Sequence, residues 1–307
     1  MKYPRSKPEK WMFMKEVKRI ANAKINLGLD VVTKREDGYH DLRMVMETIT
    51  LHDKLRLKKI RKDEVVLKTN LPYLPTDERN LVVQIIHHIK KKYNIGTGVF
   101  ADLYKVIPVG AGLAGGSADA AQTILGMNEL FDLGMTMDEM LAMGVQFGAD
   151  IPYCILGGAM LAEGIGDQLS AIHQPMCLEL VVVKPKVSVS TPYVFKHLKA
   201  ESIVNHPNID ALVKALNEEN LDEVIQYMGN VLEEVTFEGY PQVLEVKKAI
   251  MATGAKGALM SGSGSAVFGI YNSREDCKIA AKKLSTNPLV RNAFVAQTRG
   301  MIEREGK

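Results

Sequence analysis

The sequence is poor in cysteine, in aromatic residues and in net charge. Its 307 residues include three cysteines, one tryptophan and 6% aromatic residues in all, and the formal net charge is +3. Cys154, Cys177 and Cys277 lie too far apart for a disulfide framework or a zinc-ligand pattern, so we expect a reducing compartment, the cytoplasm. A charge this small argues against the nucleic-acid-binding proteins, which concentrate lysine and arginine. Acidic small-molecule substrates remain compatible with it.

Long hydrophobic runs are also missing. No apolar run approaches the roughly 18 residues that a membrane-spanning helix needs, so we predict no membrane partner. The first residues, MKYPRSKPEKWMFMKEVKR, are basic but have no apolar stretch before a cleavage site, and they predict no signal peptide. We expect residues 1–14 to form a disordered lead-in, with Met12 and Met14 as alternative starts to Met1.

What the sequence does contain is typical of a globular protein with a substantial core. Hydrophobic residues make up 46% and charged residues 24%, which are ordinary values. The length allows one large domain or two medium-sized ones. We predict two mixed α/β halves, residues 15–165 and 166–300, because both strands and helices are predicted on each side of the boundary between them.

Residue periodicity predicts the elements. Alternating and β-branched residues predict strands, with internal turns in some segments, at 16–35, 42–60, 63–69, 98–107, 160–172, 177–190, 255–273 and 294–301. Apolar residues at helical spacing predict helices at 78–94, 117–133, 135–148, 191–198, 209–233, 240–254 and 273–287. Ser117 is expected to cap its helix, and Thr136 with Glu139 has the spacing of a capping box.

A glycine-rich segment, IPVGAGLAGGSADAAQT at residues 107–123, is the first candidate for function. Its GAGLAG stretch matches the dinucleotide-binding pattern G-x-G-x-x-G. That fold also needs a second parallel strand with an acidic residue about 20 residues further on, where this sequence predicts a helix at 135–148. In addition, Pro108 separates the loop from its strand. A Walker A loop is excluded because no Lys-Ser or Lys-Thr follows the last glycine.

Two explanations remain for these glycines. They could form a turn that only allows a helix to pack closely, or they could bring backbone N–H groups to a phosphate at the positive end of the following helix. The density of small residues in GAGLAGGSA favours phosphate binding. ATP then fits the loop better than a dinucleotide does.

Four segments in order resemble one enzyme family. PVGAGLAGGSADAA resembles the phosphate loop of the GHMP kinases, the superfamily of galactokinase, homoserine kinase, mevalonate kinase and phosphomevalonate kinase. That loop reads P-x-x-x-G-L-(G/A)-x-(S/G)-S-(S/A). NAKINLGLDVVTKREDGYHDL, FGADIPYCILGGAMLAEGIGDQL and LMSGSGSAVFGIY resemble further motifs of the family. Together they span the chain from about Val17 to Phe294.

The resemblance implies a two-domain α/β fold of the α+β two-layer kind, with the active site in the cleft between the domains. It implies ATP and Mg²⁺ as cofactors. The DGYH and STPYVF segments further imply transfer of the γ-phosphate to the tertiary 2-hydroxyl of 4-diphosphocytidyl-2-C-methyl-D-erythritol, in the methylerythritol phosphate route to isoprenoid precursors. A mevalonate- or homoserine-type kinase is the alternative, and a binding module without turnover is a third hypothesis. An intact Lys24 and Asp150 argue against the third.

The resemblance also implies catalytic residues. Asp150 in GADIPY is the expected general base, although a turn aspartate ahead of Pro152 would look the same. Lys24 in NAKINL is the expected partner that keeps Asp150 ionised, with a surface lysine on an edge strand as the alternative. Strand alternation places Lys24 and Asn26 on one face, opposite Ile25, and we expect Asn26 to hold substrate.

The remaining expected contacts fall in three groups. The ATP-binding residues are Lys105, Pro108, Gly110, Gly112, Leu113, Ala114, Gly115, Gly116 and Ser117. The substrate-binding residues, besides Asn26, are Tyr39, His40, Phe195, Gly262 and Gly264, with Tyr39 and Phe195 enclosing the cytosine ring and His40 at its polar edge. Ser117 is the candidate Mg²⁺ ligand, although Ala118 replaces the second serine of the family motif. Lys105 could instead be a solvated strand-edge lysine, Gly262 and Gly264 a tight hairpin, and Asp119 only a partner of the helix dipole.

Overall fold

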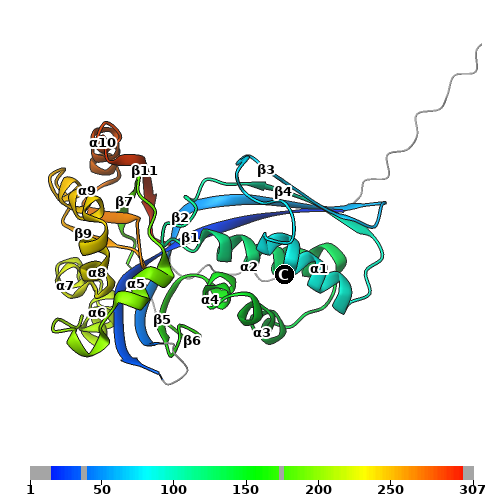
Figure 1. Cartoon of the computed structure of the whole chain (residues 1–307), viewed down its shortest axis with the longest axis horizontal. Helices are drawn as coiled ribbons and strands as arrows, with labels where there is room; N and C mark the ends of the chain where they lie inside the picture. The colour runs from blue at the N-terminus through cyan, green and yellow to red at the C-terminus, as the bar shows by residue number, and fades with distance from the viewer. Residues whose placement is uncertain (1–14, 36–39, 173–175, 300–307) are drawn as a thin grey trace, which may run out of the picture.

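The computed structural model describes residues 15–35, 40–172 and 176–299. Two long antiparallel strands, β1 (Glu16–Lys34) and β2 (His40–Ile60), run through both halves of the molecule and connect them (Figure 1). Tyr39 and the expected lead-in, residues 1–14, lie outside the described residues.

Two sheets are formed by the described part of the chain. The first has seven strands, in the order β3-β4-β2-β1-β8, with β5 pairing to β2 and β6 to β5. The second has four antiparallel strands in the order β11-β7-β10-β9. The strands not yet bounded are β3 (Val65–Thr69), β4 (Gly98–Tyr104), β5 (Ala159–Glu163), β6 (Gln168–Ala171), β7 (Glu179–Pro185), β8 (Gly229–Asn230), β9 (Gly257–Met260), β10 (Val267–Tyr271) and β11 (Val290–Gln297).

Helices cover the sheets in two groups (Figure 1). The first group consists of α1 (Leu81–Lys92), α2 (Gly115–Phe131) and α4 (Asp150–Leu156), which pack on the first sheet, and α3 (Met137–Phe147), which packs on α2 and α4. The second group gathers around the second sheet and the far ends of β1 and β2. It consists of α5 (Thr191–His197), η1 (Ala200–Ser202), α6 (Ile209–Asn217), α7 (Leu221–Tyr227), α8 (Leu232–Gly239), α9 (Pro241–Met251) and α10 (Arg274–Leu284).

The core between the two sheets explains why the halves form one body. Ile25 and Val45 of the first sheet pack in one apolar cluster with Val182 and Phe268 of the second. All four side chains are buried. The residue after Thr298 also joins the first sheet, because Arg299 N donates to Thr48 O on β2. The two halves therefore share one apolar core.

Several local predictions are confirmed. Helix α3 occupies the region where a dinucleotide-binding fold would place its second strand, and Thr136 and Glu139 form the expected capping box. Ile25 lies in the core while Lys24 and Asn26 share the opposite face of β1. These results follow from sequence periodicity and neighbouring side chains alone.

Three local predictions were wrong. Ser117 is not the cap of α2, because the helix begins at Gly115 after Ala114, which has a left-handed backbone (φ 54°). The strand expected over 98–107 ends at Tyr104, since the N–H groups of the two residues before Pro108 donate to the Asp53 carboxylate instead of the sheet. The helix expected over 209–233 is interrupted by β8, which pairs with β1.

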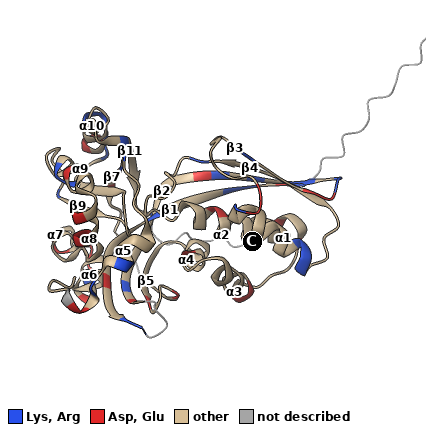
Figure 2. Cartoon of the chain, viewed as in Figure 1, with Lys and Arg blue, Asp and Glu red and all other residues tan. Residues whose placement is uncertain are grey.

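The described residues contain no helix with both the length and the hydropathy needed to cross a bilayer. All three cysteines of the chain are free thiols. Acidic and basic residues are interspersed over both halves in the view of Figure 2.

Candidate active site

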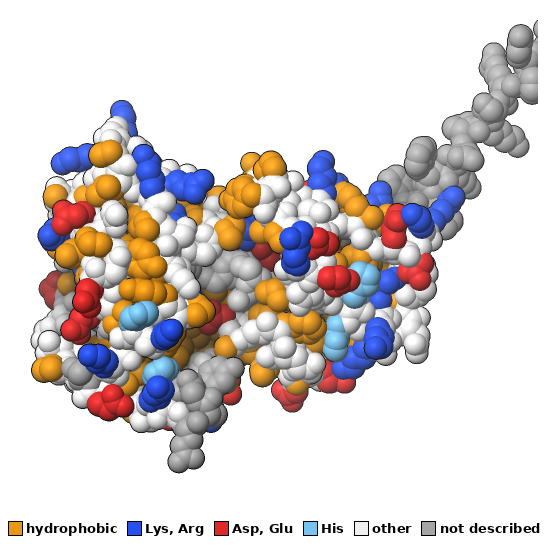
Figure 3. Space-filling view, viewed as in Figure 1, with side chains coloured by type: hydrophobic (Ala, Val, Ile, Leu, Met, Phe, Trp, Pro, Cys, Tyr) orange, Lys and Arg blue, Asp and Glu red, His pale blue; other side chains and the backbone are white. Residues whose placement is uncertain are grey.

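A cavity of about 1020 Å³ lies between the two halves of the molecule. The space-filling view shows this region as a hollow bordered by hydrophobic side chains (Figure 3). Its lining combines the glycine loop at 108–116, the second glycine loop at 261–265, and side chains from β1, β2 and α5. Both loops therefore face one chamber.

The first glycine loop is open toward the cavity. Gly110 has a positive φ of 61°, and a Cβ added at Gly110 or at Gly116 would meet no atom within 4 Å. The loop leads directly into α2, whose first residue is Gly115. Unpaired backbone N–H groups and the positive end of the helix dipole both favour an anion at such a terminus. This geometry suits a phosphate group.

The two glycine loops touch each other at one point. Gly112 has a φ of 78°, and a Cβ there would lie 2.1 Å from the carbonyl oxygen of Ser261. Ser261 Oγ donates to Gly112 O at 2.9 Å, and Ala266 N donates to Ala111 O at 3.0 Å. Glycine at position 112 thus lets the loops pack backbone against backbone.

Hydrogen bonds from neutral side chains hold the second loop in shape. Asn230 Nδ2 donates to Met260 O and Gly262 O, each at 2.8 Å. The hydroxyl groups of Thr191 and Ser263, which both line the cavity, lie 2.7 Å apart. The segment is the connection between β9 and β10, as the hairpin alternative predicted, but its second glycine, Gly264, packs against Met260 and is not part of the cavity lining.

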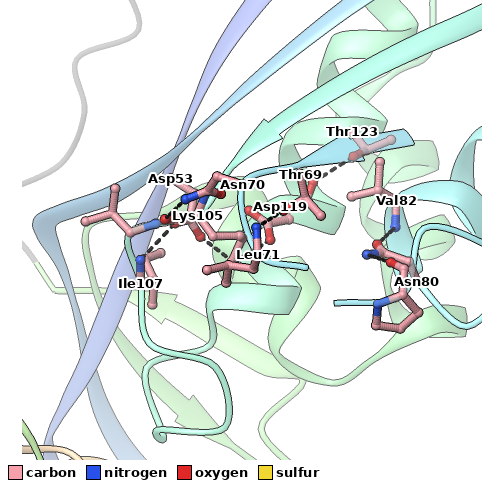
Figure 4. A network of polar contacts seen from close by, with 12 residues as sticks. Asp53, Thr69, Asn70, Leu71, Asn80, Val82, Lys105, Ile107, Asp119 and Thr123 are labelled. Atoms are coloured by element: carbon pink, nitrogen blue, oxygen red, sulfur yellow. Dashed lines mark hydrogen bonds and ion pairs between the residues drawn. The ribbon is translucent and has the colours of Figure 1, made fainter. Parts of the chain in front are cut away.

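A buried charge network lies beside the first loop (Figure 4). Lys105 Nζ forms ion pairs with Asp53 and with Asp119 Oδ2, the latter at 2.5 Å. Lys105 is 6% exposed, so the solvated strand-edge alternative was wrong. Asn70 holds the Lys105 backbone from both sides, accepting from its N–H at 2.7 Å and donating to its C=O at 3.0 Å.

Protonation in this network is set by burial and by the clustered charges. The two carboxylates raise the pKa of Lys105, outweighing the opposing effect of its burial. Burial raises the pKa of Asp119, the Lys105 ammonium opposes the rise, and the Asp53 carboxylate adds to it. Asp119 Oδ1 is buried and has no hydrogen-bond partner, and the residue lines the cavity. The expectation that Asp119 only balances the helix dipole was therefore wrong.

Lys24 is a buried lysine, not the surface residue of the alternative hypothesis. It is 5% exposed, lines the cavity, and donates from Nζ to Asn26 Oδ1 at 2.7 Å. Its backbone N–H donates to Leu113 O, which ties β1 to the first glycine loop. Asn26 is fully buried behind Lys24 and does not line the cavity. The Asn26 side chain therefore orients the Lys24 ammonium group.

Asp150 begins helix α4 and lines the same cavity as Lys24. In the described residues no ion pair joins the two, so both groups are available to a ligand between them. The charges of Asp150 and Lys24 both act on the thiol of Cys154, which is partly buried. Burial raises the pKa of its thiol, Asp150 raises it further and Lys24 opposes the rise. Lys24 and Asp150 therefore act on a common small region.

At the other end of the cavity, two rings from different halves lie together. The centroids of His40, on β2, and Phe195, on α5, are 5.4 Å apart with the planes tilted by 38°. His40 is buried and its Nε2 has no hydrogen-bond partner. Burial, and then the nearby Lys34 charge, lower the pKa of His40, so its ring is neutral at pH 7. A flat polar ring could stack and hydrogen-bond here.

The cavity collects most of the expected site residues. Those among its lining are Lys24, His40, Lys105, Pro108, Gly110, Gly112, Leu113, Ala114, Gly115, Gly116, Ser117, Asp150, Phe195 and Gly262. The sequence interpretation missed Asp53. A signal existed, because Asp53 shares the alternating inward positions of β2 with the buried Leu51 and Leu55, where an acid requires a partner.

Comparisons with known proteins agree on one family. The model of the GHMP kinases N terminal domain matches residues 80–158, and the model of the GHMP kinases C terminal region matches residues 199–288. The chain is 43% identical over 286 residues to the 4-diphosphocytidyl-2-C-methyl-D-erythritol kinase of Lachnospira eligens, covering 93% of this chain and 99% of that protein. The kinase of the same name from Acetivibrio thermocellus is 42% identical, with 93% and 100% covered.

Solved structures give the same result. A crystal structure of 4-(cytidine 5'-diphospho)-2C-methyl-D-erythritol kinase superposes with a TM-score of 0.80 at 32% identity, covering 92% of this chain and all of that one. Homoserine kinase from Cytophaga hutchinsonii superposes with a TM-score of 0.73 at 21% identity, covering 94% and 96%. The second likeness concerns the fold alone.

Proposed function

The chain belongs to the GHMP kinases, and from this premise we propose that it transfers the γ-phosphate of ATP to the 2-hydroxyl group of 4-diphosphocytidyl-2-C-methyl-D-erythritol. The observation that supports this proposal most directly is that one cavity holds three features. They are an open glycine loop at a helix N-terminus, the side chains of Lys24 and Asp150, and the His40–Phe195 ring pair. We assign these three features to a phosphate site, a reaction centre and a base site. The product would be the 2-phosphate used in the methylerythritol phosphate route to isoprenoid precursors.

The first glycine loop would hold the phosphates of ATP. Its backbone N–H groups and the start of α2 supply positive potential, and Gly110 and Gly116 leave room for close approach. Lys105 supports this wall but is already neutralised by Asp53 and Asp119, so it positions the wall more than it neutralises phosphate. The apolar residues Leu74 and Leu81 line the same cavity and could accept the adenine ring.

Asp150 would act as the general base and Lys24 as the neighbouring cation. Phosphoryl transfer to an alcohol proceeds through a loose transition state, so the hydroxyl proton leaves late and a carboxylate of ordinary basicity suffices. Lys24, buried and oriented by Asn26, would stabilise the developing alkoxide next to Asp150. This division of labour is supported by their shared cavity and by the absence of an ion pair between them in the described residues.

The residues present fit a magnesium ion. Asp119 Oδ1 is a buried carboxylate oxygen without a hydrogen-bond partner, and Ser117 lies one half-turn before it on α2; both line the cavity. In the described residues no group of three or more His, Cys, Asp or Glu side chains could hold a metal, so phosphate and water oxygens would complete the shell, as Mg²⁺ prefers. Bound there, the ion would neutralise phosphate charge.

Domain limits and location complete the proposal. We keep the division at residues 15–165 and 166–300, supported by the two family models on either side of it, although β6 beyond that limit still pairs with β5. The cytoplasm is proposed as the site of action, because free thiols and ATP both suit a reducing, nucleotide-rich compartment.

The direct test is phosphate transfer from Mg-ATP to 4-diphosphocytidyl-2-C-methyl-D-erythritol, with mevalonate and homoserine as competing acceptors. We expect turnover with the first acceptor alone, and a decrease in kcat of about 10²–10⁴-fold in Asp150→Asn. Folding of the variant is checked by circular dichroism and by its thermal transition. Turnover only with mevalonate or homoserine would retain the family and reject the acceptor, whereas full activity of Asp150→Asn would reject the base.

A further inference from the structure

Two lysines line the end of the cavity next to the His40–Phe195 ring pair. Lys34 ends β1 and lies directly opposite His40 in the β1–β2 register. Lys196 follows Phe195 on α5, and it accounts for the blue band on that helix in Figure 2. Elements from both halves of the molecule therefore bring two ammonium groups to the place where the base is proposed to bind.

The other cations of the cavity lining have partners or an assigned role. Lys105 is paired with two carboxylates, and Lys24, which donates to the neutral Asn26 side chain, is assigned to the reaction centre. Arg79 forms a two-point pair with Asp77, with N–O distances of 2.9 and 2.8 Å. In the part of the chain that the structure describes, the ammonium groups of Lys34 and Lys196 form no hydrogen bond and no ion pair. Glu201 is an acid of the same region, since its charge and that of Lys34 act on His40 in opposite directions, but within the described ranges it is paired with neither ammonium group.

Solvated surface lysines are common, so exposure alone would mean nothing. Here, however, both side chains line the cavity, and the Lys34 charge lowers the pKa of His40. Phosphate oxygens are the natural partners of a compact ammonium group. A ligand with its base at the ring pair and its reacting hydroxyl at Asp150 must place whatever joins the two between these points.

We propose that Lys34 and Lys196 form a diphosphate subsite, which binds the two phosphates that join the cytidine to the polyol of the acceptor. This inference rests on the proposed function. The subsite selects a nucleoside diphosphate over a nucleoside, and it contributes to recognition of the acceptor, not to binding of ATP. Because both lysines are largely exposed, their effect is screened by salt.

Calorimetric binding of CDP and of cytidine separates the diphosphate from the base. We expect Lys34→Met and Lys196→Met each to weaken CDP binding by about 5- to 10-fold, and the double variant by roughly 50-fold. Cytidine binding should be unchanged in all three variants. The salt dependence of CDP binding should also become shallower in the double variant. Lys68→Met removes an exposed lysine of β3 outside the cavity lining and serves as the control of equal charge change.

Each outcome decides one point. CDP binding by the double variant equal to that of the parent would mean that both lysines are merely solvated, and it would overturn the subsite while the parent's turnover upholds the kinase. Equal losses for CDP and cytidine would show a general disturbance of the base site and would also overturn it. A parent that neither binds CDP nor phosphorylates the proposed acceptor would reject the proposed function itself, and the subsite with it.

Discussion

The two walls of the cavity are held together by different forces. The N-terminal wall, defined here as residues 108–117 with Lys24, Lys105 and Asp150, is anchored by a buried lysine between two buried carboxylates. The C-terminal wall, defined as α5 with residues 261–265, is anchored by hydrogen bonds from neutral side chains such as Asn230. One wall concentrates charge and the other maintains shape.

A buried cation behind the C-terminal wall makes the contrast sharper. Lys184 is 3% exposed and donates to Val187 O at 2.6 Å and to Ser265 Oγ at 2.8 Å, with no carboxylate partner among the described residues. Burial, and then Arg291, lower its pKa to about 8. Charge is thus stabilised by counter-charge in the N-terminal wall, and by carbonyl and hydroxyl oxygens behind the C-terminal wall. The difference predicts which substitutions alter stability and which alter acceptor recognition.

Removing the central cation of the N-terminal wall should have the largest effect. Lys105→Met leaves Asp53 and Asp119 buried without a counter-charge, which typically costs about 3–5 kcal/mol of folding free energy. Urea unfolding measures the loss. Lys54→Met, at an exposed position on β2, provides the control. A loss below about 1 kcal/mol would show that the two carboxylates do not depend on this lysine.

A side chain at Gly112, where the two walls touch, should lower the stability of the protein. Gly112→Ala combines a positive φ with a Cβ 2.1 Å from Ser261 O, so we expect a loss of about 2 kcal/mol or more. Gly116→Ala is the matched control, because a Cβ there meets nothing within 4 Å and alanine favours the first turn of α2. Thermal unfolding of both variants is the measurement. Equal stabilities would mean that the loops can separate without cost.

Truncation in the C-terminal wall should affect recognition instead. Phe195→Ala removes the ring that lies 5.4 Å from His40, and stacking of a base on an aromatic ring contributes about 1–3 kcal/mol. We expect the KM for the cytidine-containing acceptor to rise by roughly 10-fold or more, while the KM for ATP changes little. Steady-state kinetics with each substrate varied in turn checks this. A similar rise in the KM for ATP would contradict the prediction that this wall affects acceptor recognition alone.

The smallest effect is expected from a substitution at a buried glutamate of β2. Glu47 on β2 is fully buried, and neither carboxylate oxygen has a hydrogen-bond partner. Burial raises its pKa well above the ordinary value of 4.5. The protonated form is therefore favoured by folding, and the associated stability is present at low pH and lost as pH rises above about 4.5.

Glu47→Met should consequently stabilise the protein by about 1 kcal/mol at pH 7, since an unpaired buried acceptor is removed. The gain should shrink as the pH falls through 4.5, because below that value the parent's glutamate carries its proton in the unfolded state as well. Urea unfolding at several pH values tests both points. A variant less stable than the parent would indicate that Glu47 has a partner that compensates its burial.

Local pattern determined a large part of this protein. The alternation around Lys24, the capping box at Thr136 and the helix at 135–148 are all visible in the sequence, because each depends on neighbours a few residues away. The motif at Pro108 to Ser117 likewise indicated the family, and it predicts a phosphate loop, since glycine spacing and a following helix are local features.

Only the tertiary structure decided which charges are buried and with which partners. Lys105 meets Asp53 from 52 residues away and Asp119 from 14, and neither pairing has a sequence period. The same holds for Asn26 behind Lys24, for Gly264 behind the cavity lining, and for the loop contact at Gly112. Burial and counter-charge arise when distant segments pack, so they depend on the folded chain as a whole and not on any short stretch of it.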